Sequence, residues 1–157
     1  MHPMKAVLGA ALLLIPLLAR AEVVEEQVHL LARQSAVLSD HGIQVPKVYV
    51  LSASGEVIFE GKASKFQAYE PILEALRSGK TSGRKDAHLL SLLEDAGFEP
   101  SATGVPVMVS IEIGKSIGVC PSCDPYYPDL ARFIHEHDPD ARWLRLVFEK
   151  NDYKPEG

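Results

Sequence analysis

The sequence predicts an α/β protein in which helices cover a mixed sheet, a three-layer sandwich. Short segments rich in β-branched and apolar residues alternate along the chain with segments whose apolar residues recur at helical spacing. Strands and helices interleaved in this way pack as helices against a sheet. The composition, with 46% hydrophobic and 24% charged residues, is that of an ordinary globular protein and excludes disordered and fibrous classes.

The first 21 residues are typical of a secretory signal peptide. Lys5 supplies a positive charge, residues 6–18 are apolar, and an Ala-Arg-Ala triplet follows as a cleavage site. The apolar stretch is too short for a permanent transmembrane span. We therefore expect one α/β domain over residues 22–157 that is periplasmic or secreted and has no membrane association after cleavage.

The charge balance limits the partners of this domain. The chain has a net charge of −5, and loss of Lys5 and Arg20 with the leader would make it −7. A domain this acidic has no general electrostatic attraction for nucleic acid or anionic lipid, so any such contact would need a local basic patch.

The elements of the domain are expected in the order helix, hairpin, two helices, strand, helix, strand. Helical spacing predicts the helices, with Pro71 in the first turn of its helix or kinking it, and β-branched or apolar runs predict the strands. The expected helices cover residues 22–39, 66–76, 86–96 and 127–135, and the expected strands cover 45–51, 57–59, 105–113 and 143–148.

The strongest chemical signal is the sequence Cys120-Pro121-Ser122-Cys123, which holds both cysteines of the chain. It lies between a strand and a helix, and a helix N-terminus favours the thiolate form of cysteine. Thiolates so placed are suited to metal binding or to redox chemistry, and the alternative is a structural disulfide or two inert thiols.

Zinc would need a further ligand, because zinc sites usually have at least three protein ligands. His135 lies roughly 18 Å along its helix from Cys123, which is too far. His88 is the best candidate, because the start of its helix can meet the cysteine segment at one edge of the sheet. Asp86 lies two residues earlier, as a helix cap or as a second site residue.

The Asp86-Ala87-His88 group, the preceding hairpin and the following C-P-S-C helix together resemble the cytidine-deaminase-like fold of toxin-type zinc deaminases. The resemblance implies zinc held by His88, Cys120 and Cys123, and hydrolytic deamination of a nucleobase or nucleic acid. The family has a Glu two residues after the ligand, where this chain has Leu90. Asp86 would then do the proton transfer as the catalytic residue, and a degenerate or repurposed member is an alternative.

A second resemblance is to thioredoxin-like thiol–disulfide oxidoreductases, which carry a CxxC motif at a helix start and act on protein thiols. Val45 and Pro46, at the start of the predicted hairpin, match the position of the family's cis-proline. In that family the CxxC half comes first along the chain, whereas here it comes last, so this interpretation requires a circular permutation. A non-catalytic binding module with a simple disulfide is the third alternative.

Overall fold

The structure is a computed structural model, and it describes residues 24–31, 46–64, 67–121 and 123–155. The expected signal peptide lies outside these residues. None of the helices in the described ranges has the length and apolar character needed to cross a bilayer.

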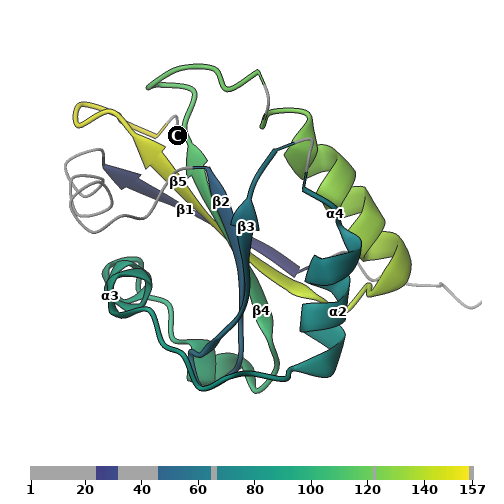
Figure 1. Cartoon of the computed structure of the whole chain (residues 1–157). Coiled ribbons are helices and arrows are strands. Elements are labelled where there is room, and N and C mark those ends of the chain that lie inside the picture. Colours follow the sequence, from purple (N-terminus) through teal and green to yellow (C-terminus); the bar gives the residue numbers. More distant parts are fainter. Residues whose placement is uncertain (1–23, 32–45, 65–66, 122, 156–157) are drawn as a thin grey trace, which may run out of the picture.

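Five strands and three α-helices make up this part of the chain (Figure 1). The strands are β1 (Val24–Leu31), β2 (Lys47–Leu51), β3 (Val57–Lys62), β4 (Val107–Ile113) and β5 (Arg142–Glu149). The helices are α2 (Glu70–Ser78), α3 (Ala87–Asp95) and α4 (Tyr126–His137), and a short 3₁₀ helix covers Pro100–Thr103.

The strands form one mixed sheet in the order β1-β5-β4-β2-β3. Strands β1, β5 and β4 are parallel, while β2 runs antiparallel to both β4 and β3. The hairpin expected from the sequence is therefore confirmed, and β3 extends three residues beyond its predicted end.

The helices cover both faces of the sheet, an arrangement consistent with the predicted three-layer sandwich (Figure 1). Helix α3 packs through its leucines on one face, in a buried cluster that includes Tyr49, Ile111 and Phe148. Helices α2 and α4 pack on the other face, in a cluster that includes Met108 and Trp143. Each helix has an apolar side toward the sheet, so burial of these sides holds the layers together.

The expected helix over residues 22–39 is wrong in its described part, which forms strand β1. The reason is a period-two pattern: Leu30 is buried on the α3 face and Val28 packs against the same cluster, while Gln27 and His29 between them are exposed. Parallel pairing with β5 satisfies the backbone groups along one side of β1, which lies at the edge of the sheet, and this tertiary pairing overrides the weaker helical spacing.

One local prediction is confirmed at Pro71, and of the two alternatives for Asp86 the structure has the helix cap. Pro71 lies in the first turn of α2, where its missing N–H leaves no helical hydrogen bond unmade. Asp86 is the N-cap of α3, and its carboxylate accepts hydrogen bonds from the backbone N–H groups of His88 and Leu89, both at 3.1 Å.

Candidate active site

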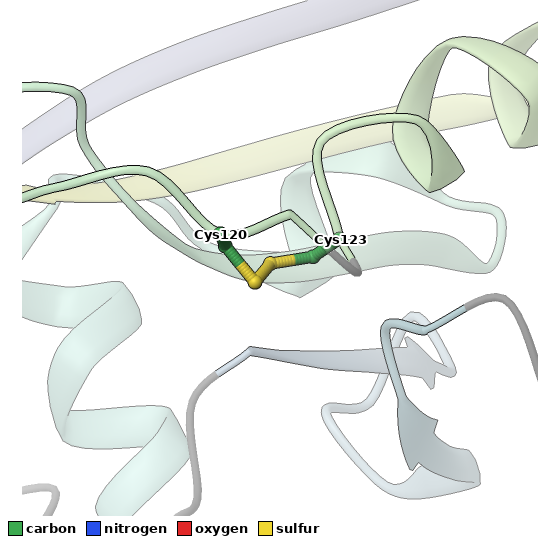
Figure 2. The surroundings of a disulfide bond; sticks show 2 residues. All are labelled: Cys120 and Cys123. Atoms are coloured by element: carbon green, nitrogen blue, oxygen red, sulfur yellow. A yellow bond between two sulfur atoms is a disulfide. The ribbon is translucent and has the colours of Figure 1, made fainter.

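The two cysteines form a disulfide in the turn between β4 and α4 (Figure 2). Their Cα atoms are 5.3 Å apart. The Cys120 carbonyl accepts backbone hydrogen bonds from Cys123 at 3.1 Å and Asp124 at 2.9 Å, which closes the turn. Helix α4 begins only at Tyr126, so the motif lies just before the helix rather than in its first turn.

The two sulfur atoms have different surroundings. Cys123 is 2% exposed and belongs to the apolar cluster under α2 and α4, whereas Cys120 is half-buried and lies at the margin of that cluster. In thiol–disulfide exchange one sulfur must be reached by a partner, and the other must be held nearby to attack it. By burial alone, Cys120 would fit the first role and Cys123 the second.

The cysteine turn lies at the end of the sheet where β2 begins (Figures 1 and 2). Cys123 shares its buried cluster with Val48 of β2 and with Ala63, which follows β3. The Ala63 N–H donates to the Pro46 carbonyl at 3.3 Å, which ties the residue before β2 to this part of the fold. The motif and Pro46 therefore lie at the same end of the molecule.

The loop that leads from β4 to Cys120 is anchored at its base by Glu149, which ends β5. Glu149 is 4% exposed, and its carboxylate accepts hydrogen bonds from the hydroxyl and the backbone N–H of Ser116. The Ser116 hydroxyl in turn accepts from the Lys150 N–H at 2.9 Å. Gly114 packs so closely on the Glu149 carboxylate that a Cβ there would overlap it. These contacts fix the direction in which the loop leaves the sheet.

The structure does not bring His88 and Asp86 to the cysteines. The backbone just before Asp86 is bonded to the β2–β3 hairpin, with the Val57 N–H donating to the Arg84 carbonyl at 2.7 Å. That hairpin turn lies beside the start of β4, because Leu51 pairs with Val107, whereas the cysteines follow the end of β4. The length of β4 separates the two places by roughly 20 Å.

The two groups also lie on different faces of the sheet. Helix α3, which carries His88, covers one face, and Cys123 is buried on the other, with α2 and α4 (Figure 1). Within the described ranges, no three His, Cys, Asp or Glu side chains gather closely enough to hold a metal ion. The Asp86 carboxylate caps its helix instead of facing the sulfur atoms.

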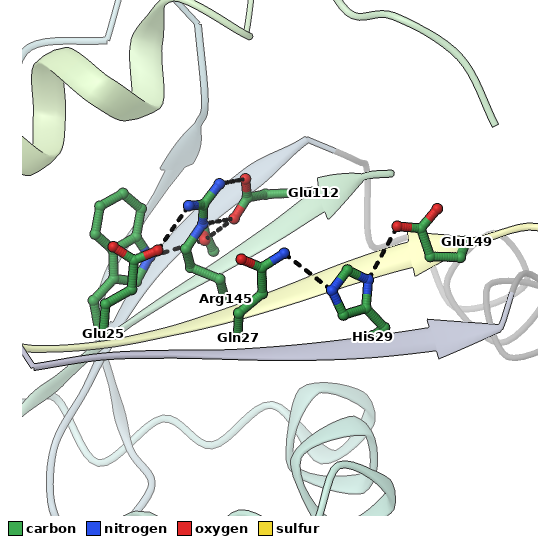
Figure 3. Close-up of polar contacts among 8 residues, drawn as sticks. Glu25, Gln27, His29, Glu112, Arg145 and Glu149 are labelled. Atoms are coloured by element: carbon green, nitrogen blue, oxygen red, sulfur yellow. Dashed lines mark hydrogen bonds and ion pairs between the residues drawn. The ribbon is translucent and has the colours of Figure 1, made fainter. Parts of the chain in front are cut away.

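Sequence reasoning missed a buried ion pair on the α4 face of the sheet (Figure 3). Glu112 of β4 is 5% exposed and accepts two hydrogen bonds from the Arg145 guanidinium, at 2.6 and 2.7 Å. Ser110 donates to the same carboxylate at 2.7 Å, and Arg145 also bonds Glu25 of β1 at 2.7 Å. The available signal was Glu112 itself, a lone acid inside the apolar run of β4.

The pKa values of Arg145, Tyr126 and Tyr127 are raised, by these contacts or by burial. Hydrogen bonding to Glu112 raises the pKa of the Arg145 guanidinium, so it stays charged. Burial raises the pKa of the Tyr126 and Tyr127 hydroxyls, and the nearby Glu112 raises that of Tyr127 further. Both phenols are therefore neutral at ordinary pH and supply no anion to the site.

A second cluster of polar side chains surrounds Glu149, the residue that anchors the cysteine loop. His29 Nδ1 is 3.0 Å from Glu149 Oε1, and the His29 ring stacks on Tyr153 with ring centroids 5.4 Å apart. Gln27 contacts the other ring nitrogen at 3.1 Å (Figure 3). Strand β1 and the segment after β5 are thus joined to the carboxylate that holds the cysteine loop.

Both polar groups lie on the floor of an open groove of about 1220 Å³. Side chains of β1 and β5 form this floor, and Tyr127 and Ala131 of α4 form one wall. The charged groups of the floor bond mainly to each other. We therefore infer that these charged side chains serve to join β1, β5 and the cysteine loop to one another.

Comparison of the chain with protein-family models, with curated proteins and with solved structures finds no match.

Proposed function

We propose that the protein catalyses thiol–disulfide exchange on protein thiols through Cys120 and Cys123. The observation that carries this proposal is the disulfide itself, which joins a half-buried cysteine to a fully buried one in the segment that follows strand β4. A purely structural staple does not need this difference in access, whereas an exchange site does. The expected export of the chain fits the proposal, because disulfide chemistry belongs to the periplasm and the extracellular space.

The reaction would proceed through a mixed disulfide. In the reduced protein, the Cys120 thiolate attacks one sulfur of a substrate disulfide, a new S–S bond forms, and the other substrate sulfur leaves as a thiolate that takes up a proton. The Cys123 thiolate then attacks the Cys120 sulfur and releases the second substrate thiol. Two electrons pass from the protein dithiol to the substrate, and an external dithiol restores the reduced state.

The arrangement of elements supports the thioredoxin-like alternative. Such a fold combines a β-α-β half carrying the CxxC motif with a β-β-α half that starts at a proline beside it. Here β4, the cysteine turn, α4 and β5 supply the first half, and Pro46, β2, β3 and α2 supply the second. The halves occur in reversed order along the chain, so we propose a circularly permuted relationship.

The zinc-deaminase hypothesis receives less support from the same geometry. It requires His88 and both cysteine thiolates at one point, and a free acid at Asp86 for proton transfer. The His88 helix covers the opposite face and follows a segment bonded at the opposite end of β4, while the Asp86 carboxylate accepts two backbone hydrogen bonds. We therefore do not propose zinc, nor a nucleobase or nucleic-acid substrate.

The proposal is tested by turnover of a disulfide substrate. Purified protein should accelerate the reduction of insulin by dithiothreitol, and Cys120→Ser and Cys123→Ser should each abolish the acceleration. His88→Ala is the matched control, because it removes the expected zinc ligand and leaves the sulfur atoms in place. Loss of one equivalent of bound zinc in His88→Ala, with no insulin reduction by the wild type, would overturn the proposal.

The order of attack gives a second test. In Cys123→Ser, the remaining Cys120 thiolate should attack the disulfide 5,5′-dithiobis(2-nitrobenzoate), release one 5-thio-2-nitrobenzoate anion and keep the other half as a stable mixed disulfide, detected by mass spectrometry. In Cys120→Ser, the buried Cys123 thiol should react at least roughly tenfold more slowly, because exchange requires access. Equal reaction rates in the folded variants would contradict the roles assigned to the two sulfur atoms.

A further inference from the structure

The loop before Cys120 exposes apolar side chains that the fold does not use. Three large hydrophobic residues are exposed in the described part of the chain: Val119 at 77%, Val105 at 47% and Ile117 at 42%. Isolated exposed apolar residues are normal, but two of these three lie in the few residues next to the proposed attacking sulfur. We call Ile117 and Val119 the apolar loop residues.

The apolar loop residues lie in a loop that is held by hydrogen bonds at its base. Its base is bonded to the sheet, since the Gly114 N–H donates to the Phe148 carbonyl at 2.7 Å and Ser116 is held by Glu149. The N–H groups of Ile117 and Gly118 donate back to the Gly114 carbonyl at 3.0 and 3.3 Å, which forms a tight turn. The turn therefore holds the backbone at Ile117, and Val119 lies between this turn and the disulfide-bonded Cys120.

The geometry points to the apolar loop residues as the specificity determinants of the exchange site. This inference rests on the proposed function. A mixed disulfide joins Cys120 to a substrate cysteine, so the residues beside that cysteine must lie over the residues beside Cys120, and Val119 is its immediate neighbour. The partner that fits this surface is an extended polypeptide segment whose cysteine is flanked by apolar side chains.

We expect the preference for apolar substrates to come from the apolar surface that is buried when the substrate covers the apolar loop residues. Covering an aliphatic side chain that is otherwise in water is favourable, so a substrate that covers both residues binds more tightly than one with polar neighbours. Glutathione disulfide has no apolar side chain to place there. We therefore expect the preference to appear in KM, with little change in kcat, because the contacts lie beside the reacting sulfur atoms and not on them.

The test compares three disulfide substrates under reduction by dithiothreitol. They are glutathione disulfide, a symmetric heptapeptide disulfide with Val and Leu beside the cysteine, and the same peptide with Ser and Asn there. Wild type should prefer the apolar peptide by roughly tenfold in kcat/KM. The double variant Ile117→Ser, Val119→Ser should lose this preference through a raised KM and should keep its rate with glutathione disulfide. Val105→Ser, an exposed apolar residue just before β4, is the matched control and should behave as wild type.

The outcomes separate the inference from the proposed function. An unchanged preference in a folded double variant that still turns over glutathione disulfide overturns the inference and leaves the exchange activity standing. A wild type that treats both peptides alike does the same. Absence of turnover with all three substrates overturns the proposed function, and the inference with it.

Discussion

Glu112 is a buried carboxylate whose charge is balanced by the guanidinium of Arg145. A carboxylate with 5% exposure is stable inside a protein only because a cation and hydrogen-bond donors surround it. Here the two N–H···O bonds from Arg145 and the hydroxyl of Ser110 provide that environment. The same guanidinium lies 5.3 Å from the centroid of the Trp143 ring, so the ion pair also adjoins the apolar cluster.

Replacing Arg145 alone should therefore cost more than replacing both partners. We expect Arg145→Met to lower the free energy of unfolding by about 3 kcal/mol, because it leaves Glu112 charged and buried without a cation. The double variant Glu112→Leu, Arg145→Met should recover at least half of that loss, since it removes the stranded charge. Urea denaturation of the single and double variants measures both values. A double variant less stable than Arg145→Met would contradict this account.

The contribution of Glu60 to the stability of the protein should depend on pH. Its carboxylate is bonded to Lys47 and, at 2.6 Å, to Arg84, and the hydrogen bond from Lys47 is the main cause of its lowered pKa. Because the folded-state pKa lies below the unfolded value of about 4.3, this stabilisation is present above that value. It is lost as pH falls through the folded pKa.

The variant Glu60→Gln should accordingly be less stable than wild type by about 1 kcal/mol at pH 7, the size expected for a partly exposed pair. The difference should shrink as the pH falls below about 4. Thermal unfolding of both proteins across this range measures it, with Glu56→Gln on the neighbouring turn as a control. A difference that stays constant with pH would show that the charge of Glu60 is not the cause.

At the scale of elements, the connection from β4 to the cysteine turn depends on a close approach at Gly114. A Cβ at this position would overlap the Glu149 carboxylate, whereas a Cβ at Gly118, in the same loop, meets nothing within 4 Å. We expect Gly114→Ala to displace Glu149 and to destabilise the protein by about 2 kcal/mol. Gly118→Ala should be nearly neutral. Denaturant unfolding of the two variants provides the comparison, and equal stabilities would contradict the anchoring role of Glu149.

The elements also show what sequence patterns can and cannot predict. The hairpin, the position of Pro71 and the cap at Asp86 follow from local chemistry, namely turn residues, a fixed backbone angle and a side chain that bonds nearby N–H groups. Strand β1 was predicted as a helix, because spacing alone does not reveal that β5, far away in sequence, pairs with it.

The candidate site was predictable only in part for the same reason. The cysteine motif can be identified from its spacing and from the strand before it. The position of His88 depends on which face of the sheet α3 covers and on which end of β4 the helix start meets. Packing decides both, and neither leaves a periodic signal in the sequence. The same holds for Arg145, whose partner lies on a different strand.

At the scale of the whole molecule, the two buried clusters on either side of the sheet do not depend on the disulfide. Only Cys123 contributes to their interior, as one small side chain among many. The bond closes a short loop, with a sequence separation of 3, so it restricts the unfolded chain little. An exchange site requires this independence, since the fold must persist in both redox states.

Reduction should therefore leave the fold intact and change the free energy of unfolding by no more than about 2 kcal/mol. Urea denaturation followed by far- and near-UV circular dichroism, with and without a phosphine reductant, measures the change. The variant Cys120→Ser, Cys123→Ser serves as a control that the reductant cannot affect. Unfolding of the wild type on reduction would identify the disulfide as a structural staple instead.

The pairing of β1 with β5 limits when this part of the sheet can fold during synthesis of the chain. Contacts across this pair join residues up to 120 positions apart, among them Glu25 and Arg145. During synthesis from the N-terminus, β1 is made long before its partner, and it can pair only after β5 has been made. Contacts of such sequence separation slow folding, because the intervening chain must be ordered first. The edge of the sheet that adjoins the groove can thus assemble only after β5 has been synthesised.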